Sequence, residues 1–205
     1  MRNGRILVAT RSAGKLRELY PILEAAGFSP TDVGTEGIPE SPAEDAVEAF
    51  GTFEENAAAK AWYFFQLSGL PSIADDSGLE VAALGGAPGV RSKRWSERRD
   101  LNGAALDAAN NELLLERLGD AADRRARYVC AAAYVDGVTA VTTRGEVNGV
   151  ILRTPLGTGG FGYDPCFFAD ELGRTFAQST IEEKERVSHR GRAVRALLER
   201  VRGDR

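Results

Sequence analysis

A long hairpin signal in the second half of the chain most constrains the fold. Two runs rich in apolar residues, Arg127 to Val135 and Val138 to Val147, flank the dipeptide Asp136-Gly137. An Asp-Gly pair between two such runs is typical of a tight turn, so the runs predict two neighbouring antiparallel strands. A sheet made only of parallel strands joined by helices is therefore excluded.

Helical and strand patterns alternate along the rest of the chain. Residues 5–10 predict a buried strand, and apolar residues then recur at helical spacing until Gly27. Thr52 and Glu55 have the spacing of a capping box, which predicts a helix that ends near Gly69. We therefore expect an α/β fold with a mixed central β-sheet flanked by helices.

Further segments complete this pattern. Residues 31–51 are rich in Gly, Pro and acids and predict a loop with a short helical piece. The remaining predicted elements are short strands at 70–74, 79–83 and 165–168, a helix from Asn102 to Gly119, a capped turn at Thr180 and Glu183, and a last helix through Val194 and Val201.

Length and composition set further limits. The 205 residues with net charge −4 fit one domain, residues 1–205, built of two lobes. Cys130 and Cys166 lie in apolar runs without metal-ligand spacing, which predicts buried, inert thiols, and a single histidine excludes a multi-His zinc site. Mild acidity argues against non-specific nucleic-acid binding. The apolar run at 6–9 is too short for a signal peptide or a membrane span, so a cytoplasmic setting is the default.

Two neighbouring acids are the strongest chemical signal. Asp75 and Asp76 follow a short apolar run and precede Ser77-Gly78. Like charges so close together raise the pKa of one carboxyl unless a cation lies between them, and a divalent metal ion would remove the conflict. Such an acid could also take a proton. The alternative is a polar turn, since Asp, Ser and Gly all favour turns.

The segment from Ala9 to Lys15 connects the first strand to the first helix. Backbone N–H groups at such a helix start bind anions, so we expect a phosphate site here. Ala9 and Leu16 replace the glycine and the Ser/Thr of a P-loop, so the P-loop itself is excluded. The alternative is an ordinary turn in which Ser12 caps the helix.

A glycine-rich loop at 157–162 carries Phe161 and is followed by Tyr163. The residues after it do not open a helix, so the loop is not a dinucleotide-binding turn. Aromatic rings among glycines can stack on a base, whereas core packing is the alternative. Ser188-His189-Arg190-Gly191 precedes the last helix, and the Arg190 fork suits a carbonyl oxygen or a phosphate. A basic helix start on the surface is the alternative reading there.

Together these segments resemble the ITP/XTP pyrophosphatase family, the HAM1-like hydrolases of unusual purine nucleotides. The resemblance covers nearly the whole chain. The matching segments are Ala-Thr-x-x-x-Gly-Lys at 9–15, Thr-Phe-x-Glu-Asn-Ala at 52–57, Ala-Asp-Asp-Ser-Gly-Leu at 74–79, Leu-Gly-Gly-Ala-Pro-Gly-Val at 84–90, Gly-Thr-Gly-Gly-Phe-Gly-Tyr-Asp-Pro at 157–165, and Glu-Glu-Lys with Ser-His-Arg-Gly within 182–191.

The resemblance implies a mixed-sheet protein of two lobes with the active site in the cleft between them, usually a homodimer. It implies Mg²⁺-dependent hydrolysis of ITP, dITP and XTP to the monophosphate and pyrophosphate, and purine nucleoside triphosphates rather than nucleic acid or membranes as partners. By position, Asp76 resembles the proton acceptor. The metal ligands that it implies are Glu55, Asp75 and Asp76.

The same resemblance implies two groups of substrate contacts. Those expected at the triphosphate are Thr10, Arg11, Ser12, Ala13, Gly14, Lys15, Lys60 and Ser77. Those expected around the base are Phe161, which would stack on it, and Gly162, Tyr163, Asp164, Lys184, His189 and Arg190. We expect Arg190 to donate to the 6-keto oxygen and so to disfavour adenine.

Three positions depart from the family pattern. Ser12 replaces an asparagine, Lys93 adds a charge where alanine is usual, and Gln178 stands in place of an acid. None alters the paired acids, so we expect activity. The alternatives are a related pyrophosphatase with another base preference, such as modified pyrimidines, a nucleotide-binding module without catalysis, and, resting only on scattered arginine clusters, an RNA-binding protein.

Overall fold

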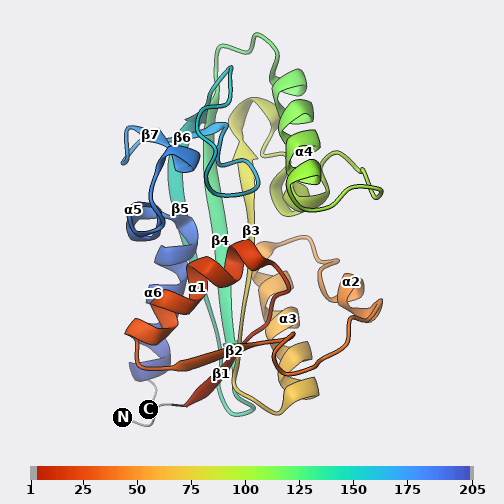
Figure 1. Ribbon diagram of the computed structural model, residues 1–205, viewed down its shortest axis with the longest axis vertical. Helices are drawn as coiled ribbons and strands as arrows, with labels where there is room; N and C mark the ends of the chain where they lie inside the picture. Colours follow the sequence, from red (N-terminus) through yellow and green to blue (C-terminus); the bar gives the residue numbers. More distant parts are fainter. Residues whose placement is uncertain (1–3, 204–205) are drawn as a thin grey trace. The chain divides into compact units, whose positions relative to one another are not determined.

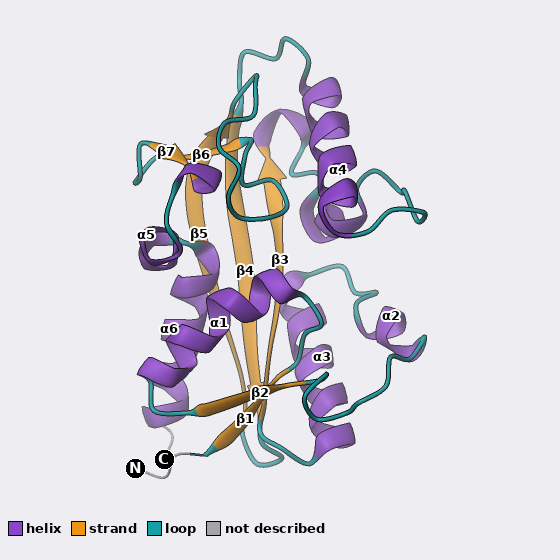
Figure 2. Cartoon of the chain, viewed as in Figure 1, coloured by secondary structure: helices purple, strands orange, loops and turns teal. Residues whose placement is uncertain are grey.

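Seven strands form one mixed sheet in the computed structural model, which describes residues 4–203 (Figures 1 and 2). The strand order is β2-β1-β3-β4-β5-β6-β7. Strand β1 pairs in parallel with β2 and β3, whereas β6 pairs antiparallel with β5 and β7. The predicted α/β class with a mixed sheet is thus confirmed.

Strands and helices alternate along the first part of the chain, and the hairpin strands follow. The strands are β1 (Arg5–Val8), β2 (Ser29–Asp32), β3 (Ser72–Val81), β4 (Arg125–Val135), β5 (Ala140–Ile151), β6 (Phe167–Ala169) and β7 (Arg174–Thr175). The helices are α1 (Ala13–Ala25), α2 (Ala43–Val47), α3 (Phe53–Ser68), α4 (Gly103–Leu118), α5 (Ile181–Val187) and α6 (His189–Gly203), with 3₁₀ turns η1 (Ala82–Leu84), η2 (Gly89–Arg94) and η3 (Phe176–Gln178).

Contacts divide the described residues into two compact units. The first unit contains residues 4–76, 130–145 and 189–203, and the second contains residues 77–129 and 146–188. Strands β3, β4 and β5 each contribute residues to both units. Each unit has its own apolar core.

In the first unit, α1 and α6 pack on one face of the sheet. Ile6, Val8 and Ile73 belong to the same buried cluster as apolar residues of these two helices. Side chains alternate between the faces of a strand, so Leu7, which is fully buried, faces the opposite side. Helix α3 contacts β1 and covers that side with its own buried residues.

In the second unit, α4 packs on the strands through Leu114 and Leu118. Tyr128, Phe167 and Phe176 form an aromatic group beside them, with ring centroids 4.7–5.8 Å apart. Such contacts add to the free energy of burial, so this group anchors the segments on either side of the glycine-rich loop.

Several local predictions are confirmed. Thr52 caps α3, and Gly69 ends it in a left-handed conformation. The capping box of Thr180 and Glu183 is present, with both bonds formed. The hairpin strands β4 and β5 are neighbours joined by residues 136–139, where the Asp136 carboxylate accepts the N–H groups of two following residues.

Three local predictions are wrong. The predicted strands at 70–74 and 79–83 are one strand, β3, because Ser77 and Gly78 continue the ladder instead of turning. Strands β2 and β7 were missed, since their sequences, Ser-Pro-Thr-Asp and Arg-Thr, lack apolar alternation. Helix α6 begins at His189, so three residues of the Ser188–Gly191 motif lie in its first turn rather than before it.

None of the helices within 4–203 has both the length and the apolar character needed to cross a membrane.

Candidate functional site: a carboxylate and cation cluster

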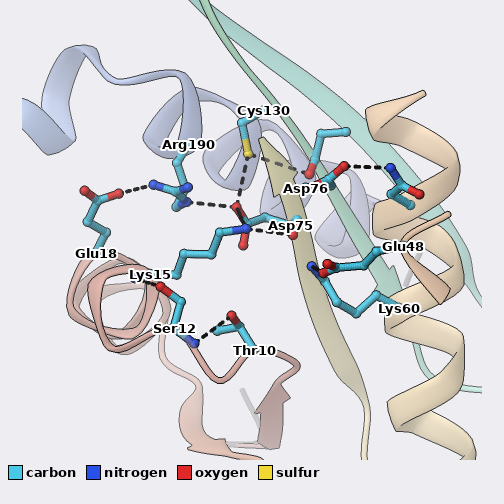
Figure 3. A network of polar contacts seen from close by, with 12 residues as sticks. Thr10, Ser12, Lys15, Glu18, Glu48, Lys60, Asp75, Asp76, Cys130 and Arg190 are labelled. Atoms are coloured by element: carbon cyan, nitrogen blue, oxygen red, sulfur yellow. Dashed lines mark hydrogen bonds and ion pairs between the residues drawn. The ribbon is translucent and has the colours of Figure 1, made fainter. Parts of the chain in front are cut away.

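The paired acids lie within β3 of the first unit, on opposite faces of the strand. Asp75 is 1% exposed, and two cations reach its Oδ2: Lys15 Nζ at 3.0 Å and Arg190 Nε at 3.0 Å (Figure 3). The Cys130 thiol donates to the same oxygen at 3.8 Å. Asp75 is therefore an ionised carboxylate in a fully buried position.

Charge explains how Asp75 remains ionised. Burial alone would raise the pKa of Asp75, but the positive charges of Lys15, Arg190 and Lys60 outweigh it and hold that pKa well below the usual range. The Asp75 Oδ1 atom is buried and has no hydrogen-bond partner within residues 4–203. An unsatisfied oxygen on a buried anion is a position suited to a cation or a donor from a ligand.

Asp76 faces the side of the sheet covered by α3. The Asn56 side chain donates to its Oδ2 at 2.9 Å, and the Asn56 Oδ1 accepts the Phe50 N–H at 2.9 Å. Burial raises the pKa of Asp76 above its usual value, although Lys15 and Lys60 act in the opposite direction and Glu48 adds to the rise. A buried carboxylate with a raised pKa is a better proton acceptor than one in water.

The loop before α1 brings a third group to the cluster. Ser12 caps the helix by accepting the Lys15 N–H at 3.4 Å, and Thr10 Oγ1 accepts the Ser12 N–H at 3.2 Å. Lys15 Nζ also donates to the Asp75 carbonyl at 3.2 Å. Burial lowers the pKa of Lys15 despite the nearby Asp75 carboxylate.

Lys60 of α3 lies close enough to both acids to feel their charges. Its Nζ is 2.6 Å from Glu48 Oε1, and the Lys60 side chain is only 7% exposed. Burial alone would lower the pKa of Lys60, but the carboxylates of Glu48, Asp75 and Asp76 raise it. The buried Lys60 and the partly buried Lys15 therefore place two ammonium groups near the two acids.

The second unit holds the glycine-rich loop. The Asp164 carboxylate accepts the Phe161 N–H at 2.9 Å and pairs with Lys184, whose Nζ lies 4.9 Å from the centre of the Phe161 ring. A Cβ on Gly160 would approach the Asp164 carboxylate to 2.0 Å, so only glycine fits there. Tyr163 is buried, its hydroxyl donating to the Ser92 carbonyl at 2.7 Å, and burial raises its pKa.

Comparison with known proteins decides the family. The model of the Ham1 family matches residues 6–200. This chain belongs to the Ham1 family. It is 51% identical to the "dITP/XTP pyrophosphatase" of Mycolicibacterium paratuberculosis, covering 94% of this chain and 93% of that protein.

Solved structures agree with this assignment. The Ham1 protein of Staphylococcus aureus superposes with a TM-score of 0.80 at 33% identity, covering 98% of this chain and 100% of that one. The structure titled nucleoside-triphosphatase / dITP/XTP pyrophosphatase from Mycobacterium abscessus gives 0.69 at 42% identity, covering 94% and 97%. The resemblance in the sequence motifs is therefore confirmed at the level of family and fold.

In this Ham1 chain, the structure gathers many of the predicted residues into two groups. The first unit brings together Thr10, Ser12, Lys15, Lys60, Asp75 and Asp76, and the second brings together Phe161, Gly162, Tyr163, Asp164 and Lys184. His189 is buried in the first unit at the start of α6. The first group contains residues expected at the triphosphate, and the second contains residues expected around the base. The roles of these residues remain predictions.

Arg190 lies between two carboxylates. It is 2% exposed, with Nε bonded to Asp75 and Nη1 paired with Glu18. These two contacts neutralise carboxylates, and a bond from Arg190 to a base oxygen stays a prediction. The prediction for Arg190 used only the motif around it. The motif could not reveal Asp75 and Glu18, which lie 115 and 172 residues away in the chain.

Two other predicted residues lie at the surface. Arg11 binds the Glu44 carboxylate and the carbonyls of the 38–39 segment, so its donors hold that loop. Glu55 is exposed, and its carboxylate accepts the Thr52 hydroxyl at 2.7 Å. Its capping contact, weighed from the sequence as the ordinary explanation, is therefore present.

Four contributors were missed. No motif includes Glu18, Glu48 or Cys130, and Asn56 lies in the motif at 52–57 but was given no role. For a metal ion, the described chain contains no group of three His, Cys, Asp or Glu side chains arranged to hold one. Glu55, Asp75 and Asp76 therefore do not form a preassembled three-ligand set. The Asp76 carboxylate, with Glu48 nearby, offers oxygens of the kind that a divalent ion prefers, whereas the unsatisfied Asp75 Oδ1 lies on the opposite face of β3.

Proposed function

We propose that this Ham1 chain is a nucleoside triphosphate pyrophosphatase that converts ITP, dITP and XTP to the monophosphate and pyrophosphate. Relatives that are about half identical over nearly the whole chain carry the name dITP/XTP pyrophosphatase. The observation that carries the chemical proposal is the cluster itself, in which Asp75 and Asp76 lie near the ammonium groups of Lys15 and Lys60.

Asp76 is the proposed catalytic base. It accepts a proton from the water that attacks the α-phosphorus, and its raised pKa suits that step. The bond from Asn56 fixes the orientation of the Asp76 carboxylate, since the opposite end of the Asn56 amide is held by a backbone N–H. Asp75 remains charged and does not take the proton.

The phosphates are proposed to bind at Lys15, Lys60 and the loop from Thr10 to Gly14. Lys15 uses two of its three N–H donors on Asp75, so one donor can reach a phosphate oxygen. Backbone N–H groups at the start of α1 add the partial positive charge of a helix end. The two lysines would stabilise the charge of the departing pyrophosphate.

Mg²⁺ is the proposed cofactor. When bound, it would neutralise phosphate oxygens as negative charge develops during the displacement. Asp76 and the nearby Glu48 would hold it, with Asp75 and Glu55 as further ligands predicted by the motif. Because these carboxylates supply only some of the oxygens that Mg²⁺ needs, substrate phosphate oxygens would complete its coordination.

The base is proposed to stack on Phe161, whose ring carries the Lys184 ammonium on one side. We expect a homodimer acting in the cytoplasm on free nucleotides. The family resemblance supports the dimer, and the sequence composition supports the location. Light scattering of the purified chain measures the oligomeric state.

One assay tests the proposed reaction. The chain is incubated with ITP, dITP, XTP, GTP or ATP, with and without Mg²⁺, and the products are separated and identified. Monophosphate and pyrophosphate from the first three substrates, only with the metal, support the proposal. Diphosphate and phosphate contradict it, a pyrimidine preference indicates a different pyrophosphatase, and binding without turnover indicates a non-catalytic module.

A further inference from the structure

Helix α4 sends two polar side chains to a single residue of the glycine-rich loop. The Gly162 N–H donates to Asp107 Oδ2 at 2.7 Å, and the Gly162 carbonyl accepts from Asn111 Nδ2 at 2.8 Å. Asp107 and Asn111 are four residues apart, so they lie on one face of the helix. Both hydrogen-bonding groups of one residue are thus held by one helical turn.

The orientation of the Asn111 amide is set by this arrangement. Its Nδ2 donates a second bond, to the Asp107 carbonyl at 2.8 Å. A flipped amide would set Oδ1 against two carbonyl oxygens, so only one orientation is compatible. The Oδ1 atom consequently lies buried without a hydrogen-bond partner in the described part of the chain, which costs desolvation free energy. The two bonds donated by the Asn111 amide nitrogen therefore contribute more free energy than a bond to its oxygen would.

Gly162 has a backbone conformation that glycine adopts readily and other residues rarely adopt. Its φ is +62°, in the left-handed region, and it separates Phe161 from Tyr163. The neighbouring N–H groups are also bonded, that of Phe161 to Asp164 and that of Tyr163 to the Tyr128 hydroxyl at 3.1 Å. Three consecutive peptide N–H groups are therefore fixed before any ligand binds.

A fixed loop binds more tightly than a mobile one. A glycine-rich segment has many backbone conformers, and a ligand that must order it loses binding free energy. None of the family motifs noted in the sequence includes Asp107 or Asn111, which lie in the helix between two of those motifs. Neither residue belongs to the proposed contact set around the base.

We propose that Asp107 and Asn111 are positioning residues that hold Gly162 so that the Phe161 ring is presented to the purine before binding. The inference rests on the proposed function, in which Phe161 stacks on the base. It predicts that loss of either side chain weakens recognition of the base and leaves recognition of the polyphosphate unchanged.

The variants are Asp107→Ala and Asn111→Ala, with Asp107→Asn as the conservative change that retains an oxygen to accept the Gly162 N–H. Asn110→Ala is the matched control. Asn110 is a buried neighbour on α4, but it bonds to the 92–96 segment, accepting the Ser96 N–H at 2.8 Å and donating to the Lys93 carbonyl at 3.1 Å. It therefore reports general loss of helix packing.

The first readout separates KM from kcat for ITP. We expect KM to rise about three- to tenfold in both alanine variants, which is the effect of one lost hydrogen bond, with kcat within about twofold of wild type. Asp107→Asn should restore KM to within about twofold. Inhibition by inorganic pyrophosphate, which has no base, should be unchanged in every variant.

The second readout is hydrogen exchange at the Gly162 amide, which needs no activity. Exchange should accelerate in Asp107→Ala and remain as in wild type in Asn110→Ala. Unchanged KM in both alanine variants, or an equal rise in Asn110→Ala, overturns the inference. If wild type does not hydrolyse ITP, the proposed function fails, and the exchange result still decides whether Asp107 holds Gly162.

Discussion

Replacing Arg190 with methionine tests the idea that this residue serves to balance the charge of Asp75. Methionine keeps much of the apolar stem and removes the guanidinium. Asp75 would then lose one of two cations at its Oδ2, and Glu18 would lose its pair. Asp75 and Arg190 are 1% and 2% exposed, so water cannot replace the lost partner without a change in structure.

The size of the effect follows from this burial. Removing one partner of a buried ion pair costs about 3–5 kcal/mol, because a charge remains without compensation. For a chain of 205 residues, each kcal/mol shifts the melting temperature by about 2–4 °C. We therefore expect Arg190→Met to melt about 6–20 °C below wild type.

Thermal unfolding, together with urea unfolding at neutral pH, measures this change. Arg200→Met is the control, since Arg200 is an exposed arginine of the same helix whose contact with the Thr142 carbonyl is 3.4 Å long. Its free energy of unfolding should change by less than about 0.5 kcal/mol.

The double variant Asp75→Asn/Arg190→Met gives the second test. Because the neutral amide no longer needs a cation, the double variant should be less destabilised than the sum of the two single changes, by about 0.5–3 kcal/mol. A loss below about 1 kcal/mol in Arg190→Met, or strict additivity in the double variant, would refute the charge-balance role.

Three further outcomes are expected. Asp76→Asn should abolish turnover of ITP while calorimetry finds nucleotide binding nearly unchanged, and near-normal turnover would remove Asp76 from its role. Phe161→Ala should raise KM for ITP and XTP, with an unchanged KM pointing to a core role instead. Burial alone would raise the pKa of Asp32, but bonds from Thr35, Tyr20 and the backbone lower it. The Asp32 carboxylate thus stabilises the fold at pH values above the ordinary carboxyl pKa of about 4. At pH 6 the free energy of unfolding of wild type should therefore exceed that of Asp32→Asn by about 1 kcal/mol. Urea titrations should find that the gap closes as the pH falls towards 2, and a constant gap would contradict the assignment.

The sequence predicts features that depend on neighbours along the chain. The caps at Ser12, Thr52 and Thr180 were found because each lies three residues before its backbone partner. The turn at Asp136 carries its own dipeptide signal. The class of sheet followed from these local features and the hairpin.

Features that depend on distant partners could not be predicted in this way. The Ser77-Gly78 pair favours a turn locally, yet pairing with neighbouring strands keeps it extended in β3. The position of Arg190 depends on carboxylates from two other elements, and a motif carries no information on which of them it meets. Asn56 likewise gains its role from Asp76, twenty residues later.

The cations around Asp75 determine whether the fold depends on a bound metal ion. Zinc fingers and similar small domains collapse when a chelator removes their ion, since the ion alone offsets the ligand charges. Here Lys15 and Arg190 already neutralise the innermost acid from within the chain. Under the proposed function, removal of Mg²⁺ would therefore stop turnover and leave the chain folded, and return of the ion would restore activity without refolding.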